Sequence, residues 1–394
     1  MLYILSSAQL VPHYSVPSPI SPSTMKTVVI LGGSYGGIST AHRILKQAKT
    51  TPVKIILVSP NTHHYWNIAG PRALVPGQIL DDKIFQSIAP GFKQYPAGRF
   101  EFVLGSAESL DAENKKVTVA GPTGPKVLDY DILILATGSS TKGDVPLKGR
   151  GSTEATKDAI HVFQQKVKQA KDIHIAGAGS TGVELAGEIA FEYKGQKNVT
   201  LIASGPHILE GTPAGVTKTA TKQLQNLKVT IKTSSKVTGD AKMPDGRTEL
   251  TLSSGEKITT DLYLPALGLV PNSSYLAHSL VNAAGFVKVD EFLRVKDATD
   301  VWAVGDVADV QRAQYVNTEK QSVHVAKNIV AILKGAQPVK YKREEKDMLA
   351  VPVGRKAGTG HMGGMKLPSF MVNMVKGKNL FMDKMPGMIS GSAF

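Results

Sequence analysis

The sequence predicts an α/β fold with two parallel β-sheets, the second inserted in the chain of the first. The segments "VILGGSYGG" (29–37) and "HIAGAGSTGVELAGE" (174–188) each join an apolar strand to a helix through a glycine turn. A second apolar strand follows each of them, at 53–60 and at 198–204. Strand–helix–strand units of this length form parallel sheets with right-handed crossovers. Both units are therefore expected to be Rossmann-like.

Length and composition restrict the classes of protein that fit. A chain of 394 residues suits two or three domains. It has no cysteine, which excludes disulfides, thiolate metal sites and electron relay through a cysteine pair. No apolar run reaches the roughly 18 residues of a membrane-spanning helix. The net charge of +14 favours phosphate-bearing partners, namely nucleotides, anionic lipid or nucleic acid, or simply reflects a lysine-rich surface.

The first unit runs from the strand at 27–33 through a helix at 38–48 to the strand at 53–60. Residues 100–130 then contain three short strands separated by turn residues, which predicts an antiparallel excursion. The excursion leads to "YDILILATGSS" (130–140), a buried strand that ends in Thr-Gly. The order of elements thus brings the chain back to the first sheet before the second unit begins.

The second half continues with further short strands after the second unit, in "VTIKT", "TELTLSS" and "KITTDLYLPALG". A buried strand, "VWAVGDVADV" (301–310), precedes a helical stretch at 319–335. The chain changes character near residue 341, because eight of the eleven methionines lie between 348 and 388. Such methionines either fill irregular gaps in a core or face lipid or a quinone.

The glycine turns have a specific chemical use. In a nucleotide-binding unit the first glycine permits a tight turn, the second lets the backbone approach a pyrophosphate, and the third lets helix and strand pack closely. The helix N-terminus then presents N–H groups to the phosphates. Gly177, Gly179 and Gly182 match this pattern, whereas the first copy has Gly32 and Gly37 with Ser34 between them. A glycine-rich turn without a ligand is the alternative.

Two such turns predict two dinucleotides. An enzyme with two dinucleotide sites most simply passes a hydride from a nicotinamide to a flavin. The expected organisation is a disordered extension at 1–24, an FAD domain at 25–142 and 272–335, an NAD(P)H domain at 143–271, and a C-terminal α+β segment at 336–394.

At this point the chain resembles a known family. "VVILGGSYGG", "YDILILATGSS", "HIAGAGSTGVELAGE" and "VWAVGDVADV" occur in the order typical of pyridine-nucleotide:flavin oxidoreductases with two dinucleotide-binding domains. The stretches 351–381 and 63–74 resemble the apoptosis-inducing factor 2 branch, also called the ferroptosis suppressor branch. The resemblance implies an FAD enzyme that oxidises NADH or NADPH and reduces quinones or related acceptors at membrane surfaces.

The resemblance also assigns residues. Asp306 would accept a hydrogen bond from a ribityl hydroxyl, Glu184 would face the nicotinamide carboxamide, and Lys376 would lie near the flavin. The alternatives are a helix cap for Asp306, a favourable charge in the first helical turn for Glu184, and an exposed lysine for Lys376. The full set of implied cofactor-binding residues is Gly32, Gly33, Ser34, Gly36, Gly37, Ser59, Asn67, Arg72, Ala107, Thr137, Gly138, Gly177, Gly179, Ser180, Thr181, Gly182, Gly268, Gly305, Asp306 and Val307.

Two positions depart from the family pattern. Ser59 stands where an acid is expected to hold the FAD adenosine ribose, and a serine hydroxyl binds it more weakly than a carboxylate. Ala203 and Ser204 stand at the matching position of the second unit, with neither an acid nor an arginine. Poor discrimination between NADH and NADPH is therefore expected. His63 and His64 lack a third ligand at a suitable spacing, so no metal is expected.

The expected function is hydride transfer from NAD(P)H to FAD, followed by direct delivery of electrons to a quinone-like or other small acceptor. Two alternatives remain. A redox-controlled, nucleotide-dependent protein that binds DNA or a protein partner would use the net charge, and a flavin oxidoreductase could act on one small metabolite. The expected location is the cytoplasm, with peripheral contact to an anionic membrane such as a lipid droplet, the plasma membrane or the outer mitochondrial surface.

Overall fold

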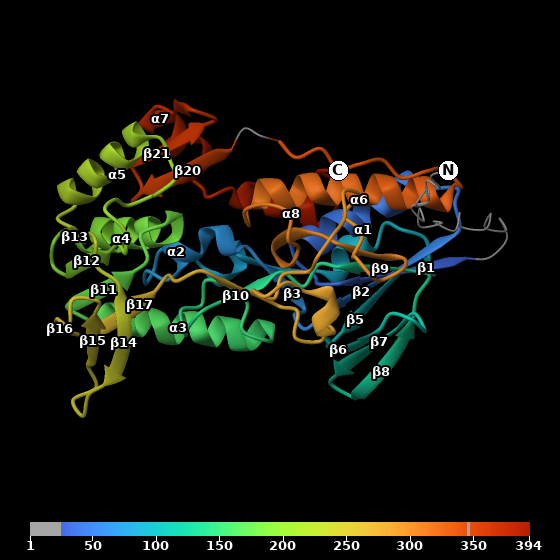
Figure 1. Cartoon of the computed structure of the whole chain (residues 1–394), viewed down its shortest axis with the longest axis horizontal. Helices are drawn as coiled ribbons and strands as arrows, with labels where there is room; N and C mark the ends of the chain where they lie inside the picture. Colours follow the sequence, from blue (N-terminus) through green and yellow to red (C-terminus); the bar gives the residue numbers. More distant parts are fainter. Residues whose placement is uncertain (1–24, 345–346) are drawn as a thin grey trace, which may run out of the picture.

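The computed structural model describes residues 25–344 and 347–394, so the expected disordered extension at 1–24 lies outside the described residues. Two parallel sheets dominate the fold (Figure 1). The first has the order β19-β9-β1-β2-β5, and every neighbouring pair in it is parallel. Its strands are β1 (Lys26–Leu31), β2 (Val53–Ser59), β5 (Phe100–Leu104), β9 (Ile132–Leu135) and β19 (Val301–Ala303).

Two helices of the first sheet lie along each other (Figure 1): α1 (Tyr35–Gln47) and α6 (Tyr315–Leu333). The expected helix at 319–335 therefore begins one turn earlier. The Ser322 hydroxyl donates to the carbonyl of Gly36 across this helix pair. Below the helices, the apolar residues of β1 and β2 are almost completely buried, which places the main core between sheet and helices.

The antiparallel excursion is shorter than the sequence predicts. It comprises β6 (Ser106–Asp111), β7 (Lys116–Gly121) and β8 (Gly124–Asp129), each antiparallel to its neighbour. Residues 100–104 instead form β5 at the edge of the parallel sheet, where Phe100 pairs with Ile55 of β2. The backbone N–H of Gly105 still bonds the carbonyl of Ser59, and the chain leaves the sheet directly after it.

The second parallel sheet has the order β13-β12-β11-β17. Its strands and helices are α3 (Thr153–Gln169), β11 (Asp172–Ala176), α4 (Ser180–Tyr193), β12 (Asn198–Ile202), α5 (Ala214–Asn226), β13 (Thr230–Lys232) and β17 (Leu262–Pro265). Three antiparallel strands extend from it: β14 (Val237–Lys242), β15 (Thr248–Leu252) and β16 (Lys257–Thr260). The expected second Rossmann-like unit is confirmed.

A two-stranded antiparallel ribbon joins the two sheets. It consists of β10 (Ser139–Thr141), where the chain leaves the first sheet, and β18 (Leu269–Pro271), where it returns. The Thr137 hydroxyl donates to the Asn272 carbonyl at 2.7 Å, and the Asn272 amide donates to the Thr137 carbonyl at 2.8 Å. The second unit is thus inserted in the first and fixed to it at both crossings.

The C-terminal segment is α+β, as expected, and contacts both units. A three-stranded antiparallel sheet packs beside α4 and α5, whereas α8 lies near α1 (Figure 1). The Gln223 amide on α5 donates to the carbonyl of Gly358 at 3.0 Å. The elements are β20 (Met348–Val353), β21 (Ala357–Met362), β22 (Met365–Lys366), α7 (Ser369–Val372), the π-helical turn η6 (Asn373–Gly377), η7 (Met382–Lys384) and α8 (Met385–Ile389).

Short elements complete the molecule. They are β3 (His63–Tyr65), η1 (Asn67–Ala69), α2 (Gly70–Ala73), η2 (Asp81–Lys83), β4 (Phe85–Ser87), η3 (Ala89–Phe92), η4 (His278–Leu280) and η5 (Gly305–Val307). Strand β3 pairs antiparallel with β4. Within residues 25–344 and 347–394, no helix has both the length and the apolar character needed to cross a membrane.

Candidate active site

The first glycine turn connects β1 to α1. Gly32 has a φ of +123°, which side-chain-bearing residues rarely adopt. A Cβ on Gly37 would overlap the carbonyl oxygen of Gly32, so this turn needs glycine where helix and strand meet. Helix α1 has no side-chain cap and no acid in its first turn. Its first N–H groups therefore remain available to an anionic ligand.

The second turn, between β11 and α4, repeats this geometry. Gly177 has a φ of +103°, and a Cβ on Gly182 would overlap the carbonyl oxygen of Gly177. Gly179 precedes the helix, and the space that a Cβ would occupy there is open. In the first turn this middle position is Ser34, whose hydroxyl lies 3.4 Å from Nδ1 of His64. The serine side chain is thus placed toward β3.

One cavity of about 1340 Å³ joins the first turn to the start of α4 and to the C-terminal segment. That volume exceeds the roughly 300–1,000 Å³ typical of a small-ligand pocket. The implied residues that line it are Gly32, Gly33, Ser34, Gly36, Ser59, Asn67, Ala107, Thr137, Gly138, Ser180, Thr181, Glu184, Gly268, Gly305, Asp306 and Lys376. The implied residues outside its lining are Gly37, Arg72, Gly177, Gly179, Gly182 and Val307.

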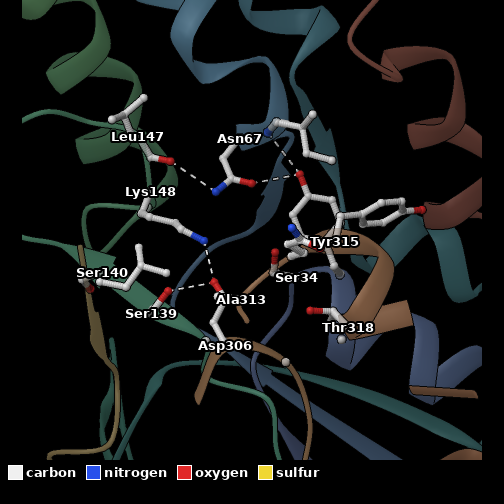
Figure 2. A pocket seen from close by; sticks show the side chains of 18 of the residues that line it. Ser34, Asn67, Ser139, Ser140, Leu147, Lys148, Asp306, Ala313, Tyr315 and Thr318 are labelled. Atoms are coloured by element: carbon white, nitrogen blue, oxygen red, sulfur yellow. Dashed lines mark hydrogen bonds and ion pairs between the residues drawn. The ribbon is translucent and has the colours of Figure 1, made fainter. Parts of the chain in front are cut away.

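Asp306 lies in η5, directly after β19, and points into the cavity (Figure 2). Ser139 Oγ and Lys148 Nζ both donate to its Oδ2, each at 2.8 Å. The Asp306 side chain is only 14% exposed. Among the described residues no other hydrogen bond to this carboxylate occurs, so Oδ1 can accept one from a ligand. Sequence reasoning missed Lys148, because the loop that carries it contains no motif.

Asn67 lies across the cavity from Asp306 (Figure 2). Its Nδ2 donates to the carbonyl of Leu147 at 3.2 Å, and its Oδ1 accepts from the Tyr35 hydroxyl at 3.0 Å. The Tyr35 ring in turn contacts Tyr315 edge-on, with ring centroids 5.2 Å apart. Both tyrosines line the cavity. No sequence motif indicates this aromatic wall, because its members come from opposite ends of the first unit.

The other end of the cavity lies at the carboxyl end of β2. Ser59 is buried, and its hydroxyl accepts the backbone N–H of Asn61 at 3.1 Å. A Cβ on Gly33 would lie 2.6 Å from the Ser59 Cβ, so the serine packs directly beneath the glycine turn. Ala107 lines the cavity from the start of β6.

Glu184 and Lys376 meet where the second unit faces the C-terminal segment. Lys376 Nζ lies 2.6 Å from Glu184 Oε1, and their side chains are 15% and 8% exposed. Burial raises the pKa of the Glu184 carboxyl above its ordinary value, and the adjacent Lys376 ammonium opposes that rise. Lys376 is thus largely buried, so the alternative interpretation of it as an exposed lysine is wrong. Glu184 is the fifth residue of α4, so its placement in the first helical turn was wrong.

Arg72 does not line the cavity. Its guanidinium pairs with Glu188, one turn beyond Glu184 on α4, with Nη2 2.8 Å from Oε1. It also donates to the carbonyls of Gly377 and Lys378 at 2.8 and 3.2 Å. These bonds tie α2, α4 and η6 together, so Arg72 positions the Lys376 turn.

The family of the chain follows from its similarity to known proteins. Residues 26–332 match the model of the pyridine nucleotide-disulphide oxidoreductases. The chain belongs to this family. Membership assigns FAD and NAD(P)H to the chain, as the sequence predicted. Disulphide reduction through a cysteine pair is excluded for this member, because the chain has no cysteine.

Individual relatives place the chain more closely within the pyridine nucleotide-disulphide oxidoreductases. It is 47% identical to oxidoreductase ptaL of Pestalotiopsis fici, over 93% of this chain and 100% of that protein. It is 29% identical to ferroptosis suppressor protein 1 of Homo sapiens, over 90% of this chain and 93% of that protein. The expected ferroptosis suppressor and apoptosis-inducing factor-like branch is thereby confirmed.

A solved structure supports the fold. The sulfide:quinone oxidoreductase of Aquifex aeolicus superposes with a TM-score of 0.77 at 17% identity, covering 93% of this chain and 92% of that one. At this identity the likeness shows that the two chains share a fold.

The first unit fits an FAD on three observations. The glycine turn leaves the N-terminus of α1 uncapped for a pyrophosphate, Asp306 keeps one carboxylate oxygen for a hydroxyl donor, and the cavity extends past Ser59 toward β6. The second unit offers a matching uncapped helix at α4. The same cavity extends from the first glycine turn to the start of α4.

Proposed function

We propose that the chain is an FAD-dependent NAD(P)H oxidoreductase whose electron acceptor is an apolar, quinone-like molecule. Bound FAD supplies the chemistry, accepting hydride from the nicotinamide and releasing electrons to the acceptor. The observation that carries the proposal is that one cavity touches both nucleotide units and an apolar wall from the C-terminal segment. Since the chain has no cysteine to relay electrons, the acceptor itself must enter this cavity.

The apolar wall gives the acceptor its character. Met348, Met362, Met371 and Val375 line the cavity from β20, β21, α7 and η6. Outside the wall, Met365, Phe370 and Met374 are 64%, 69% and 67% exposed. Large apolar side chains that line a cavity favour an apolar ligand, and exposed ones in the same segment favour contact with an apolar surface. The core-packing interpretation applies to Met385 and Met388, which are buried, and the proposal assigns the ligand-facing role to the methionines of the wall.

The residues of this chain have distinct roles in the proposal. The N-termini of α1 and α4 bind the two pyrophosphates, and Asp306 orients the ribityl chain through Oδ1. Glu184 accepts a hydrogen bond from the nicotinamide carboxamide while Lys376 balances its charge. The wall at η6 excludes water from the place where nicotinamide and acceptor approach the ring.

The name of one structural neighbour agrees with this acceptor class, since it is a sulfide:quinone oxidoreductase. Lys356, Lys366 and Lys378 are exposed in the same C-terminal segment as the apolar side chains. Lysines beside exposed apolar residues favour contact with an anionic membrane. The enzyme of this proposal works at the cytoplasmic face of such a membrane.

The test removes part of the apolar wall and leaves the residues assigned to the nucleotide sites unchanged. The double variant Met371→Ser, Val375→Ser, in which both residues line the cavity, should lower kcat/KM for a quinone with an isoprenoid tail by about tenfold, or ~1.4 kcal/mol, because apolar contact is lost. Reduction of ferricyanide, which needs no apolar contact, should stay unchanged. Leu80→Ser is the matched control, since Leu80 is an exposed apolar residue that lies outside the cavity lining.

Two results would contradict the proposal. Wild-type efficiency of the double variant with the tailed quinone would show that the acceptor enters elsewhere. Failure of the reduced wild-type protein to reduce any quinone, although it reduces ferricyanide, would remove quinones as the acceptor class.

A further inference from the structure

A carboxylate lies at the end of β12, where the sequence shows none. The strand ends at Ile202, and Ala203 and Ser204 follow it. Glu210 folds back over the next residue, so that a Cβ on Gly205 would overlap the Glu210 carboxyl group. Glycine at 205 is thus what allows the carboxylate to lie there. The Glu210 carboxylate therefore lies over Gly205, three residues beyond the last residue of the strand.

The loop that carries Glu210 is anchored to the glycine turn itself. The Leu209 backbone N–H donates to the carbonyl of Ala178, between Gly177 and Gly179, at 2.8 Å. The Thr212 hydroxyl donates to the Leu209 carbonyl at 2.7 Å, and Leu209 is 2% exposed. Glu210 is therefore held at a fixed distance from the turn that faces a pyrophosphate.

The backbone of Gly205 is also held by the residues that follow β13. The Gly205 carbonyl accepts the N–H of Ser234 at 2.7 Å. Lys232, the cation at the adjacent end of β13, bonds both carboxylate oxygens of Glu256 at 2.6 and 2.8 Å. Lys232 is thus already paired with Glu256, and among the described residues it makes no bond to the Glu210 carboxylate.

We propose that Glu210 recognises the adenosine ribose of the nicotinamide dinucleotide and makes NADH the preferred reductant. The inference rests on NAD(P)H binding at the Gly177–Gly182 turn, which the proposed function shares. In such units the adenosine ribose lies at the end of the second strand. A carboxylate there accepts hydrogen bonds from the ribose hydroxyls and repels the 2′-phosphate of NADPH. Discrimination is therefore stronger than Ala203 and Ser204 alone predict.

The experiment measures the reduction of the bound flavin under anaerobic conditions, which requires no electron acceptor. NADH should reduce the wild-type flavin at least about tenfold more efficiently than NADPH, and Glu210→Gln should decrease that ratio by about tenfold through tighter NADPH binding. Gly205→Ala, which displaces the carboxylate without removing it, should shift the ratio in the same direction. Glu113→Gln, an exposed residue in the turn between β6 and β7, is the charge-matched control.

A second measurement separates binding from reduction. Titration with NAD⁺ and NADP⁺ should show that Glu210→Gln binds NADP⁺ about tenfold more tightly relative to NAD⁺ than the wild type does. A wild-type protein without preference for NADH would overturn the inference. So would an unchanged ratio in both Glu210→Gln and Gly205→Ala at wild-type flavin content. Normal flavin reduction without quinone turnover would instead contradict only the proposed acceptor.

Discussion

Asp306 is the residue on which binding of the flavin most depends. Its carboxylate is largely buried, and both donors that the protein provides, Ser139 and Lys148, bind the same oxygen. No other described residue donates to this carboxylate, which lines the cavity (Figure 2). A hydrogen bond to a charged group contributes roughly 1.5–3 kcal/mol. Loss of this one acceptor should therefore be visible in flavin content.

We expect Asp306→Ala to weaken FAD binding by roughly 10- to 150-fold, the equivalent of that energy. Lys148 also loses its partner, which adds an unpaired cation to the site. The flavin-to-protein absorbance ratio after purification, and FAD titration of the apoprotein, measure the effect. Asp309→Ala is the control, because Asp309 is exposed and only accepts from Asn282. Full flavin occupancy in Asp306→Ala would exclude Asp306 from the binding site.

At the scale of elements, helix α4 carries two buried carboxylates one turn apart, and each has its own cation. Glu184 pairs with Lys376 of η6, and Glu188 pairs with Arg72 of α2. Removing one member of a buried pair typically costs about 3–5 kcal/mol, because the other charge stays buried. The π-helical turn is thus held by its own lysine and by the arginine that binds its carbonyls. A short irregular element can therefore present an ordered wall to the cavity.

Helix α1 holds the C-terminal element α8 through a buried neutral histidine. Nε2 of His42 donates to the carbonyl of Ile389 at 2.9 Å, so Nδ1 accepts from the Tyr95 hydroxyl at 2.8 Å. The His42 ring stacks on Phe92 with ring centroids 3.9 Å apart. Burial lowers the pKa of His42 from 6.5 to about 4. Protonation would leave Tyr95 facing a donor and would place a charge in the core.

This histidine predicts a loss of stability in acid. The unfolded chain takes up the proton near pH 6.5 and the folded chain only near pH 4, so stability is complete above pH 6.5 and declines as the pH falls toward 4. The full difference corresponds to about 3 kcal/mol. Thermal unfolding at several pH values should show a steeper decline for the wild type than for His42→Gln. Equal slopes would show that His42 does not contribute to acid sensitivity.

At the scale of the whole molecule, an excess of positive charge occurs together with exposed apolar side chains. The chain has 46 lysines and arginines against 32 acids, and its C-terminal segment adds exposed apolar side chains. Each lysine near an anionic surface contributes about 1 kcal/mol. At 0.1 M salt this attraction is largely screened beyond about 10 Å. Exposed apolar side chains that enter the membrane would add a contribution that salt does not screen.

We therefore expect the protein to co-sediment with vesicles that contain phosphatidylserine more than with neutral vesicles. Raising the salt from about 50 to about 500 mM should weaken binding only partly, because an apolar contribution remains. The Phe370→Ser, Met374→Ser variant should lose that salt-resistant fraction, whereas Leu80→Ser should keep it. Equal binding to neutral and anionic vesicles at low salt would contradict a basic membrane-facing surface.

The sequence by itself determined the two Rossmann-like units, their insertion and the positions of both glycine turns. These features could be predicted because they depend on short-range rules: apolar strand periodicity, and glycine where a Cβ would overlap the backbone at Gly37 and Gly182. The absence of cysteine likewise excludes disulfide chemistry from composition alone, because no arrangement of this chain can supply a thiol.

Only the tertiary structure decided which charges meet. Lys148 reaches Asp306 across 158 positions of the chain, and Lys376 reaches Glu184 across 192. The Glu210 carboxylate lies over Gly205, close to the end of β12, because the backbone of Leu209 anchors its loop to the glycine turn. Such contacts depend on how distant segments pack together, and this packing cannot be read from the type and spacing of the side chains. The resemblance placed Arg72 among the cofactor residues, whereas packing directed its guanidinium to Glu188 and the η6 turn.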